Sequence, residues 1–105
     1  MITFDGMLAS LARARVGITT NRPDVTVPAI SRAQAFVGEL LATLDHGRGG
    51  KIAGVLSSIY VFTLTELQAL AVSGDLRRLD AIIALMQELR DAFATITAAP
   101  RAAVA

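Results

Sequence analysis

The residues that could carry out chemistry in this chain are few, and they cluster in one glycine-rich stretch. The single histidine, His46, begins the sequence His-Gly-Arg-Gly-Gly-Lys, which ends at Lys51. A zinc site needs several His or Cys ligands at defined spacing, and the chain has one histidine and no cysteine. A phosphate-binding loop follows a strand, whereas this stretch follows a helical pattern and lacks the required spacing. The stretch is therefore predicted to be a helix–helix connection.

The remaining polar residues do not form a catalytic arrangement. No serine has a base at a recognisable spacing, and the sequence lacks the Glu-x-x-His pairs of di-iron bundles. Asp75, Asp80 and Glu88 are interpreted as a helix cap and a solvated helix face. We therefore expect no enzyme activity, no metal and no cofactor.

The composition is apolar for a soluble chain. Of the 105 residues, 53% are hydrophobic and 18% are charged, with a net charge of +1. These values argue against disorder and against nucleic acid as a partner. The longest run without a charged residue, Ile52 to Thr65, has 14 residues, fewer than the roughly 20 of a membrane-spanning helix. Because Asp5 also argues against a secretory signal, we expect a cytoplasmic protein without membrane insertion.

Helix-breaking residues divide the chain into four segments. They cluster at 19–24, 45–50 and 73–75, and the segments between them have helical periodicity. The first predicted helix covers 2–18. The second runs from the N-cap Asp24 to the C-cap Gly47, with Pro28 in its first turn. The third covers 50–72, and the fourth runs from the N-cap Asp75 to 97. Short connections make consecutive helices antiparallel. The sequence therefore predicts an all-α fold, an antiparallel up-and-down four-helix bundle over residues 1–97, followed by a flexible tail over 98–105.

Several apolar residues lie outside the main apolar face of their predicted helix. Each could pack against a second neighbour, but together they exceed what a four-helix core needs. An exposed apolar patch is typical of a protein-binding surface, and a groove between helices suits another amphipathic helix. Homodimerisation would cover the same surface, and the pattern leaves both open. The predicted partner contacts are Phe36, Val61, Phe62, Leu64, Ile83 and Leu85.

Two charged residues lie within or beside predicted core faces. Arg15 falls on the apolar face of the first helix, and Glu66 lies at the edge of the third. An arginine stem can pack on apolar surface while its guanidinium reaches the rim. We expect these residues to pair between helices, with Asp91 or Glu66 as the partner of Arg15, or to contact a protein partner.

Three blocks of residues follow one another in a characteristic order. The first block contains Phe4-Asp5-Gly6 and Arg13-Ala14-Arg15. The second contains Ser31-Arg32-Ala33-Gln34, Glu39-Leu40, Leu44-Asp45 and Gly49-Gly50-Lys51-Ile52-Ala53. The third contains Leu56-Ser57-Ser58-Ile59-Tyr60, Gly74-Asp75 and Glu88-Leu89-Arg90-Asp91-Ala92-Phe93. In this order and spacing, over residues 4–96, they resemble the bacterial flagellin-export chaperone family FliS.

The resemblance implies a helical bundle that binds the C-terminal segment of newly made flagellin in the cytoplasm. Such a chaperone prevents premature polymerisation and delivers its client to the flagellar type III export gate. Relative to the family, the chain lacks the usual segment before Phe4, and Val61 and Phe62 stand where Asp and Tyr are common. This apolar trend leaves open an alternative, a divergent adaptor or structural bundle that self-associates and does not bind flagellin.

Overall fold

Four helices follow one another in the computed structural model of the chain: α1 (Ile2–Thr19), α2 (Pro23–Ala42), α3 (His46–Ser73) and α4 (Leu76–Val104). The structure describes the backbone of residues 2–44 and 46–104 and the side chains of residues 4–44 and 50–94. Within these residues all regular secondary structure is helical. The predicted all-α class is therefore confirmed.

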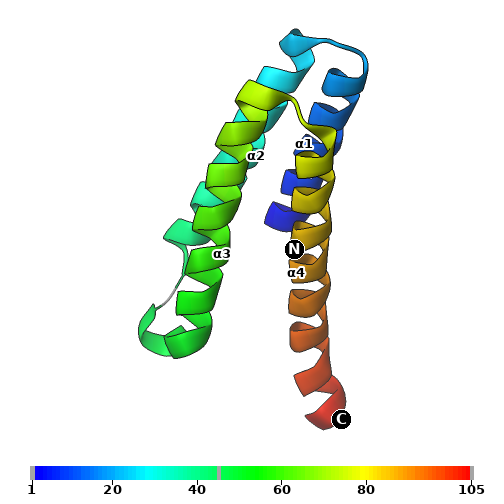
Figure 1. Cartoon of the computed structure of the whole chain (residues 1–105). Helices are drawn as coiled ribbons and strands as arrows, with labels where there is room; N and C mark the ends of the chain where they lie inside the picture. The colour runs from blue at the N-terminus through cyan, green and yellow to red at the C-terminus, as the bar shows by residue number, and fades with distance from the viewer. Residues whose placement is uncertain (1, 45, 105) are drawn as a thin grey trace.

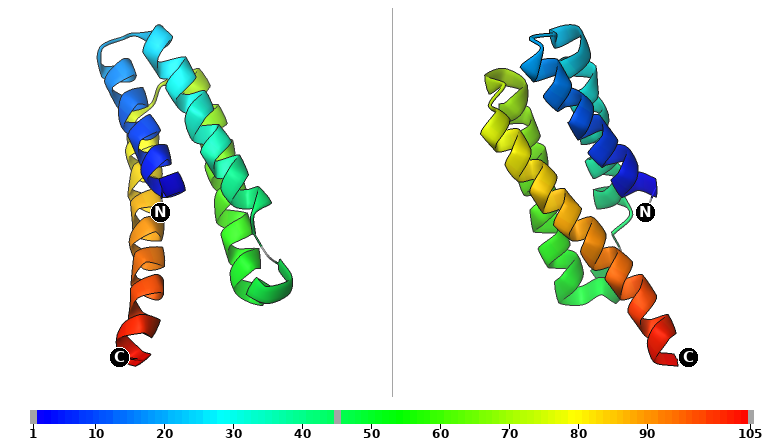
Figure 2. Two further views of the ribbon diagram at one scale, coloured as in Figure 1. Left: turned by 180° about the vertical axis from the view of Figure 1, so that it is seen from behind. Right: turned by 90° about the vertical axis from the view of Figure 1, so that its right-hand side faces the viewer.

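Each helix runs antiparallel to the next one along the chain (Figure 1). The α1–α2 and α3–α4 connections lie at one end of the bundle, and the α2–α3 connection lies at the other (Figure 2). α2 packs against α1 and α3, and α4 packs against the same two helices. This arrangement confirms the predicted up-and-down four-helix bundle.

The core draws on all four helices, at positions spaced three or four residues apart along each. Two polar residues are also buried, and each satisfies its hydroxyl on its own helix: Thr63 Oγ1 donates to the Ile59 carbonyl at 2.8 Å, and Ser10 Oγ donates to the Gly6 carbonyl at 3.0 Å. The fully buried large side chains are Met7, Leu11, Val37, Tyr60, Thr63, Leu67, Leu70, Leu79 and Met86.

The ends of α2 differ from the prediction. The helix begins at Pro23 with Arg22 as N-cap, and no side chain caps it. The prediction that Asp24 is the N-cap is wrong. Asp24 lies within the first turn, and its carboxylate accepts a hydrogen bond from Arg22 Nη2 at 2.7 Å. Pro28 consequently lies inside the helix and not in its first turn. The predicted C-cap, Gly47, is also wrong, since α2 ends at Ala42 with Thr43 as C-cap.

The ends of α3 and α4 are set by two glycines and one aspartate. Gly50 has φ 54° and ψ −125°, which separates a short first turn from the long part of α3 that the sequence predicts to start there. Gly74, with φ 62°, ends α3 in a left-handed conformation that favours glycine. Asp75 Oδ1 accepts the backbone N–H of Arg77 at 2.9 Å, so its role as the predicted N-cap of α4 is confirmed. The backbone of α4 continues as helix to Val104, and a flexible tail over 98–105 stays a prediction.

The long part of α3 is apolar enough to be compared with a membrane-spanning helix. Its 24 residues Gly50–Ser73 are long and apolar enough to cross a membrane by length and composition alone, and 22% of its most apolar 18-residue stretch is buried inside the bundle. The helix also has a core face, because Ala53, Tyr60, Leu67 and Leu70 are buried. Because most of that stretch lies outside the core, this feature points first to an apolar outer surface on α3.

Candidate protein-binding surface

An exposed apolar stripe runs along the first half of α3. Ile52 is 70% exposed, Val55 is 59% exposed and Phe62 is 54% exposed. Together with the half-buried Ile59, these residues follow one another at spacings of three and four, which places them on one face of a helix. We call Ile52, Val55, Ile59 and Phe62 the α3 stripe.

The α3 stripe lies on the side of α3 that faces α4. Glu66, four residues after Phe62 and therefore on the same face, accepts a hydrogen bond from Arg78 Nη1 of α4 at 2.8 Å. This pair joins the two helices near their connecting turn, and from there α3 and α4 diverge (Figure 1). They make the fewest contacts of the four neighbouring helix pairs. The divergence leaves the stripe without a covering helix.

α4 contributes apolar side chains to the same side. Leu85 follows Arg78 by two helical turns and Leu89 follows by three, so both lie on the face of α4 that turns toward α3. Both are half-buried and pack on the edge of the core. The α3 stripe, Leu85 and Leu89 thus form the two sides of one open apolar surface.

The six predicted partner contacts do not come together. Phe62 and Leu85 lie on the α3/α4 surface, but Val61 is turned about 100° from Phe62 by the helical step and is exposed on another side of α3. Leu64, Ile83 and Phe36 are half-buried against the core. Phe36 in particular packs on α1, where a Cβ at Gly6 would lie 2.6 Å from its ring. The assignment of these four residues to one client surface therefore stays a prediction that the packing does not itself support.

The six predicted contacts omit four members of this surface, which are Ile52, Val55, Ile59 and Leu89. By helical periodicity Ile52 falls on the same face as Leu56 and Leu67, which pack toward the core. It is exposed because it follows the break at Gly50, at the end of α3 where α3 and α4 lie apart. The signal that could have identified the surface is the apolar spacing 52, 55, 59 and 62, which forms a second stripe beside the core face.

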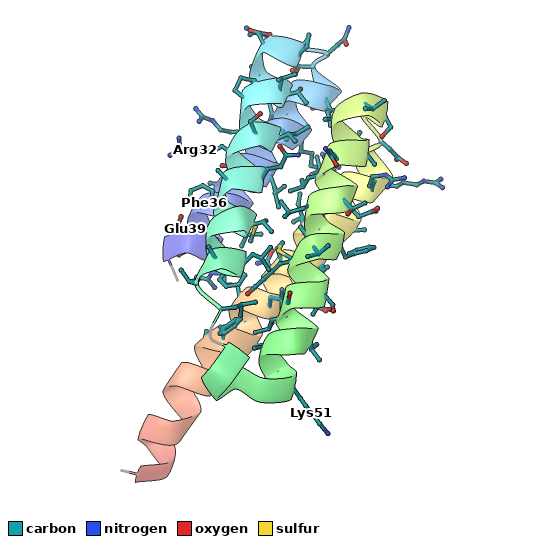
Figure 3. All side chains as sticks on the ribbon, turned by 90° about the vertical axis from the view of Figure 1, so that its left-hand side faces the viewer. Arg32, Phe36, Glu39 and Lys51 are labelled. Atoms are coloured by element: carbon teal, nitrogen blue, oxygen red, sulfur yellow. The ribbon has the colours of Figure 1, made fainter. Side chains whose placement is uncertain are left out.

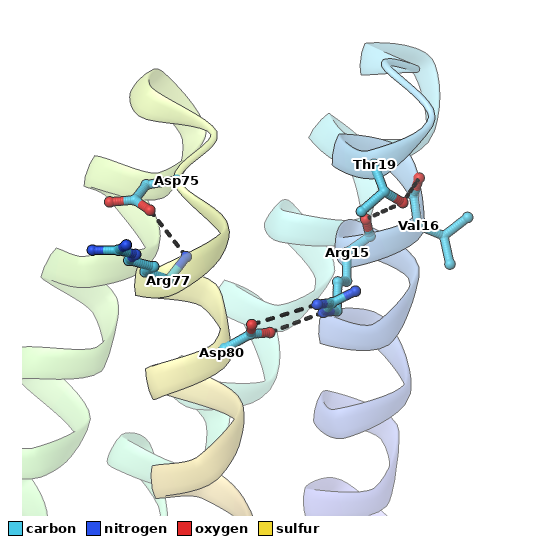
Figure 4. A network of polar contacts seen from close by, with 6 residues as sticks. All are labelled: Arg15, Val16, Thr19, Asp75, Arg77 and Asp80. Atoms are coloured by element: carbon cyan, nitrogen blue, oxygen red, sulfur yellow. Dashed lines mark hydrogen bonds and ion pairs between the residues drawn. The ribbon is translucent and has the colours of Figure 1, made fainter.

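Charged residues form interhelical ion pairs between α1 and α4. Arg15 of α1 donates from Nε to Asp80 Oδ1 of α4 at 2.9 Å (Figure 4), so Asp91 and Glu66 were the wrong predicted partners. Hydrogen bonding and the nearby charge of Asp80 raise the pKa of Arg15. Arg90 of α4 likewise donates from Nε to Asp5 of α1 at 2.5 Å. These pairs tie α4 to α1, and none of them faces the α3 stripe.

The described part of the chain offers no metal centre, because no three acidic or histidine side chains within it lie close together. The side chain of His46 lies outside the described residues. The most prominent exposed surface of the described residues is the apolar one between α3 and α4. Its chemistry suits binding of another apolar surface.

Comparisons with known proteins agree on one family. The family described as "Flagellar protein FliS" matches residues 1–100. A protein of Campylobacter jejuni named flagellar secretion chaperone FliS is 29% identical over 86% of this chain and 70% of its own length. A protein of Pseudomonas aeruginosa named flagellar secretion chaperone FliSB is 30% identical over 85% of this chain and 71% of its own length. The chain therefore belongs to the FliS family of flagellar proteins, in which both of these relatives are named as secretion chaperones.

Proposed function

We propose that this protein is a cytoplasmic flagellar secretion chaperone without enzyme activity. It binds the C-terminal segment of flagellin, prevents premature polymerisation and supports type III flagellar export. Membership of the FliS family supports the chaperone role, and the names of both relatives point the same way. The observation that carries the binding role is the α3 stripe, an exposed apolar face over which the described residues place no helix.

The client occupies the α3/α4 surface as an amphipathic helix. Ile52, Val55 and Phe62 repeat at the spacing that matches the apolar face of an antiparallel or parallel partner helix. A client segment that is disordered alone gives up conformational entropy when it folds on this surface. Because that loss offsets part of the gain from apolar burial, the complex holds the client and still allows its release for export.

The matched pair Val55→Ser and Val16→Ser tests this surface. Val55 is 59% exposed on the α3 stripe, and Val16 is 57% exposed on α1. Burying a valine against a client contributes about 1.5 kcal/mol, so Val55→Ser is expected to weaken binding of a flagellin C-terminal segment about tenfold. Val16→Ser removes the same exposed groups elsewhere and is expected to leave the Kd unchanged. Equal Kd values for both variants would place the client on another surface.

Self-association is a second way to cover the same surface. Two copies could pack their α3 stripes together, which would make the protein a structural or adaptor bundle. Light scattering of the chain with and without the flagellin segment separates the two functions. A one-to-one complex supports the chaperone, whereas a dimer that stays intact in the presence of the segment supports the adaptor.

A further inference from the structure

A cavity of about 360 Å³ lies along the contact between α1 and α2, away from the α3 stripe. At either end of it the two helices approach closely, Phe36 over Gly6 on one side and Thr26 against Gly17 on the other. Its volume falls within the range of ligand pockets and exceeds the space of one water several-fold. The residues that line it are Ser10, Arg13, Asp24, Val25, Pro28, Ala29 and Arg32.

The cavity carries an excess of positive charge. Arg13 and Arg32 both line it, and neither has a carboxylate partner among the described residues. The carboxylate at its edge, Asp24, is already held by Arg22 at 2.7 Å. Four other described arginines, Arg15, Arg22, Arg78 and Arg90, are paired with carboxylates, whereas Arg77 is exposed on α4 away from the cavity. Two unpaired guanidiniums at one cavity therefore mark a place where a negative group would be stabilised.

Arg32 is held in position at the cavity by an aromatic ring. Its guanidinium carbon lies 5.7 Å from the centroid of Phe36, within the range of a cation–π contact. Phe36 rests in turn on Gly6, where only a glycine leaves room for the ring. Arg32 and Phe36 project from the same edge of α2 (Figure 3). This contact orients the exposed guanidinium beside the cavity.

The rest of the cavity is suited to a side chain and the peptide that carries it. Val25 and Ala29 provide apolar lining. Pro28 has no N–H, so the carbonyl of Asp24 lacks its usual donor within the helix. Ser10 donates its proton to Gly6, and its oxygen still accepts hydrogen bonds.

We propose that this cavity binds an acidic side chain of a protein partner. The carboxylate is held by Arg13 and Arg32, and the aliphatic stem lies on Val25 and Ala29. A guanidinium fork binds a carboxylate through two parallel hydrogen bonds, which favours this ligand chemistry. The site is separate from the α3 stripe, so a partner at this site can bind whether or not the stripe holds a client.

The test uses the full chain and two capped peptides, Leu-Glu-Glu-Leu and its neutral counterpart Leu-Gln-Gln-Leu, with inorganic phosphate as a third ligand. Nitrogen-15 NMR follows the Nε–H signals of Arg13 and Arg32 during each titration. We expect the glutamate peptide to shift both signals and the glutamine peptide to shift neither. Arg13→Gln and Arg32→Gln are each expected to weaken binding of the glutamate peptide about threefold to tenfold, because each removes a charged hydrogen-bond donor.

The control variant is Arg77→Gln, which removes an exposed arginine outside the cavity. It is expected to leave binding of the glutamate peptide within about twofold of wild type, as surface charges away from a contact contribute little in physiological salt. Equal binding of both peptides, tighter binding of phosphate than of the glutamate peptide, or an unchanged affinity in Arg32→Gln would each overturn the proposal. Far-ultraviolet circular dichroism establishes that the variants are folded.

Discussion

Gly17 of α1 lies against the backbone of Thr26 in α2, where an added Cβ would be 2.8 Å from the Thr26 amide nitrogen. Backbone atoms cannot rotate away from such a contact, so any larger residue at position 17 forces the two helices apart. The α1/α2 contact therefore depends on a glycine that helix propensity alone disfavours. A second glycine, Gly38 of α2, has nothing within 4 Å of the same added atom.

These two glycines give opposite predictions for substitution by alanine. Gly17→Ala is expected to lower the free energy of unfolding by about 1–2 kcal/mol, since overpacking outweighs the gain in helix propensity. Gly38→Ala is expected to raise it by about 0.5–1 kcal/mol, because only the propensity changes. Urea unfolding of both variants measures the difference. Similar shifts of the two midpoints would show that α1 and α2 do not approach closely at position 17.

The Glu66–Arg78 pair is expected to stabilise the α3/α4 end of the bundle. It is the least exposed of the ion pairs described, with 25% of the Glu66 side chain and 34% of the Arg78 side chain accessible. Glu66→Gln is expected to reduce the free energy of unfolding by about 1 kcal/mol, and less at high salt. Asp80→Asn provides the comparison, because its pair with Arg15 is half exposed and a smaller loss is expected. A larger loss in Asp80→Asn would contradict this order.

The single tyrosine predicts how stability changes at alkaline pH. Tyr60 is 1% exposed, and burial raises the pKa of its phenol above 10.0. The stabilisation linked to the neutral phenol is complete below the pKa that Tyr60 has in the unfolded chain. It is lost as the pH rises through the pKa that Tyr60 has in the folded protein. Denaturation at several alkaline pH values should show stability falling, and Tyr60→Phe should remove this part of the decline. Phenolate absorbance that appears with an ordinary pKa in the folded protein would contradict the burial.

The N-cap of α4 is expected to tolerate some substitutions and not others. Asp75→Ala removes the acceptor for the Arg77 N–H and is expected to cost about 1 kcal/mol of unfolding free energy. Asp75→Asn keeps an acceptor oxygen at the same place and is expected to cost much less. Thermal unfolding of both variants provides the measurement. Equal losses would mean that the carboxylate acts through its charge and not through the cap.

The number, order and direction of the helices could be predicted because local chemistry sets them. The Gly74–Asp75 turn and the break at Gly50 occur where the sequence places glycine, and the apolar periodicity of each segment continues between such breaks. The start and end of α2 could not be predicted as well. Asp24 is a strong N-cap residue by type, but Pro23 already supplies a favourable first helical position and Arg22 binds the Asp24 carboxylate.

The candidate surface was only partly predictable for a different reason. Phe62 and Leu85 were identified as lying outside the core stripes, and they do flank the surface between α3 and α4. Which other residues join them depends on the divergence of two helices, a tertiary feature that no periodicity encodes. The same limit explains why Arg15 pairs with Asp80 and not with Asp91, since the choice depends on how α1 and α4 are rotated against each other.

Methyl NMR of the full chain shows whether the α3 stripe receives the C-terminal segment of flagellin, as we propose. A flagellin C-terminal segment is titrated into the protein while the methyl signals of Ile52, Val55 and Val16 are followed. We expect saturable shifts at Ile52 and Val55, with Val16 unchanged and a Kd in the micromolar range or tighter. An unchanged spectrum of the folded protein at about 50 µM segment, well above such a Kd, or shifts confined to other helices, would contradict it.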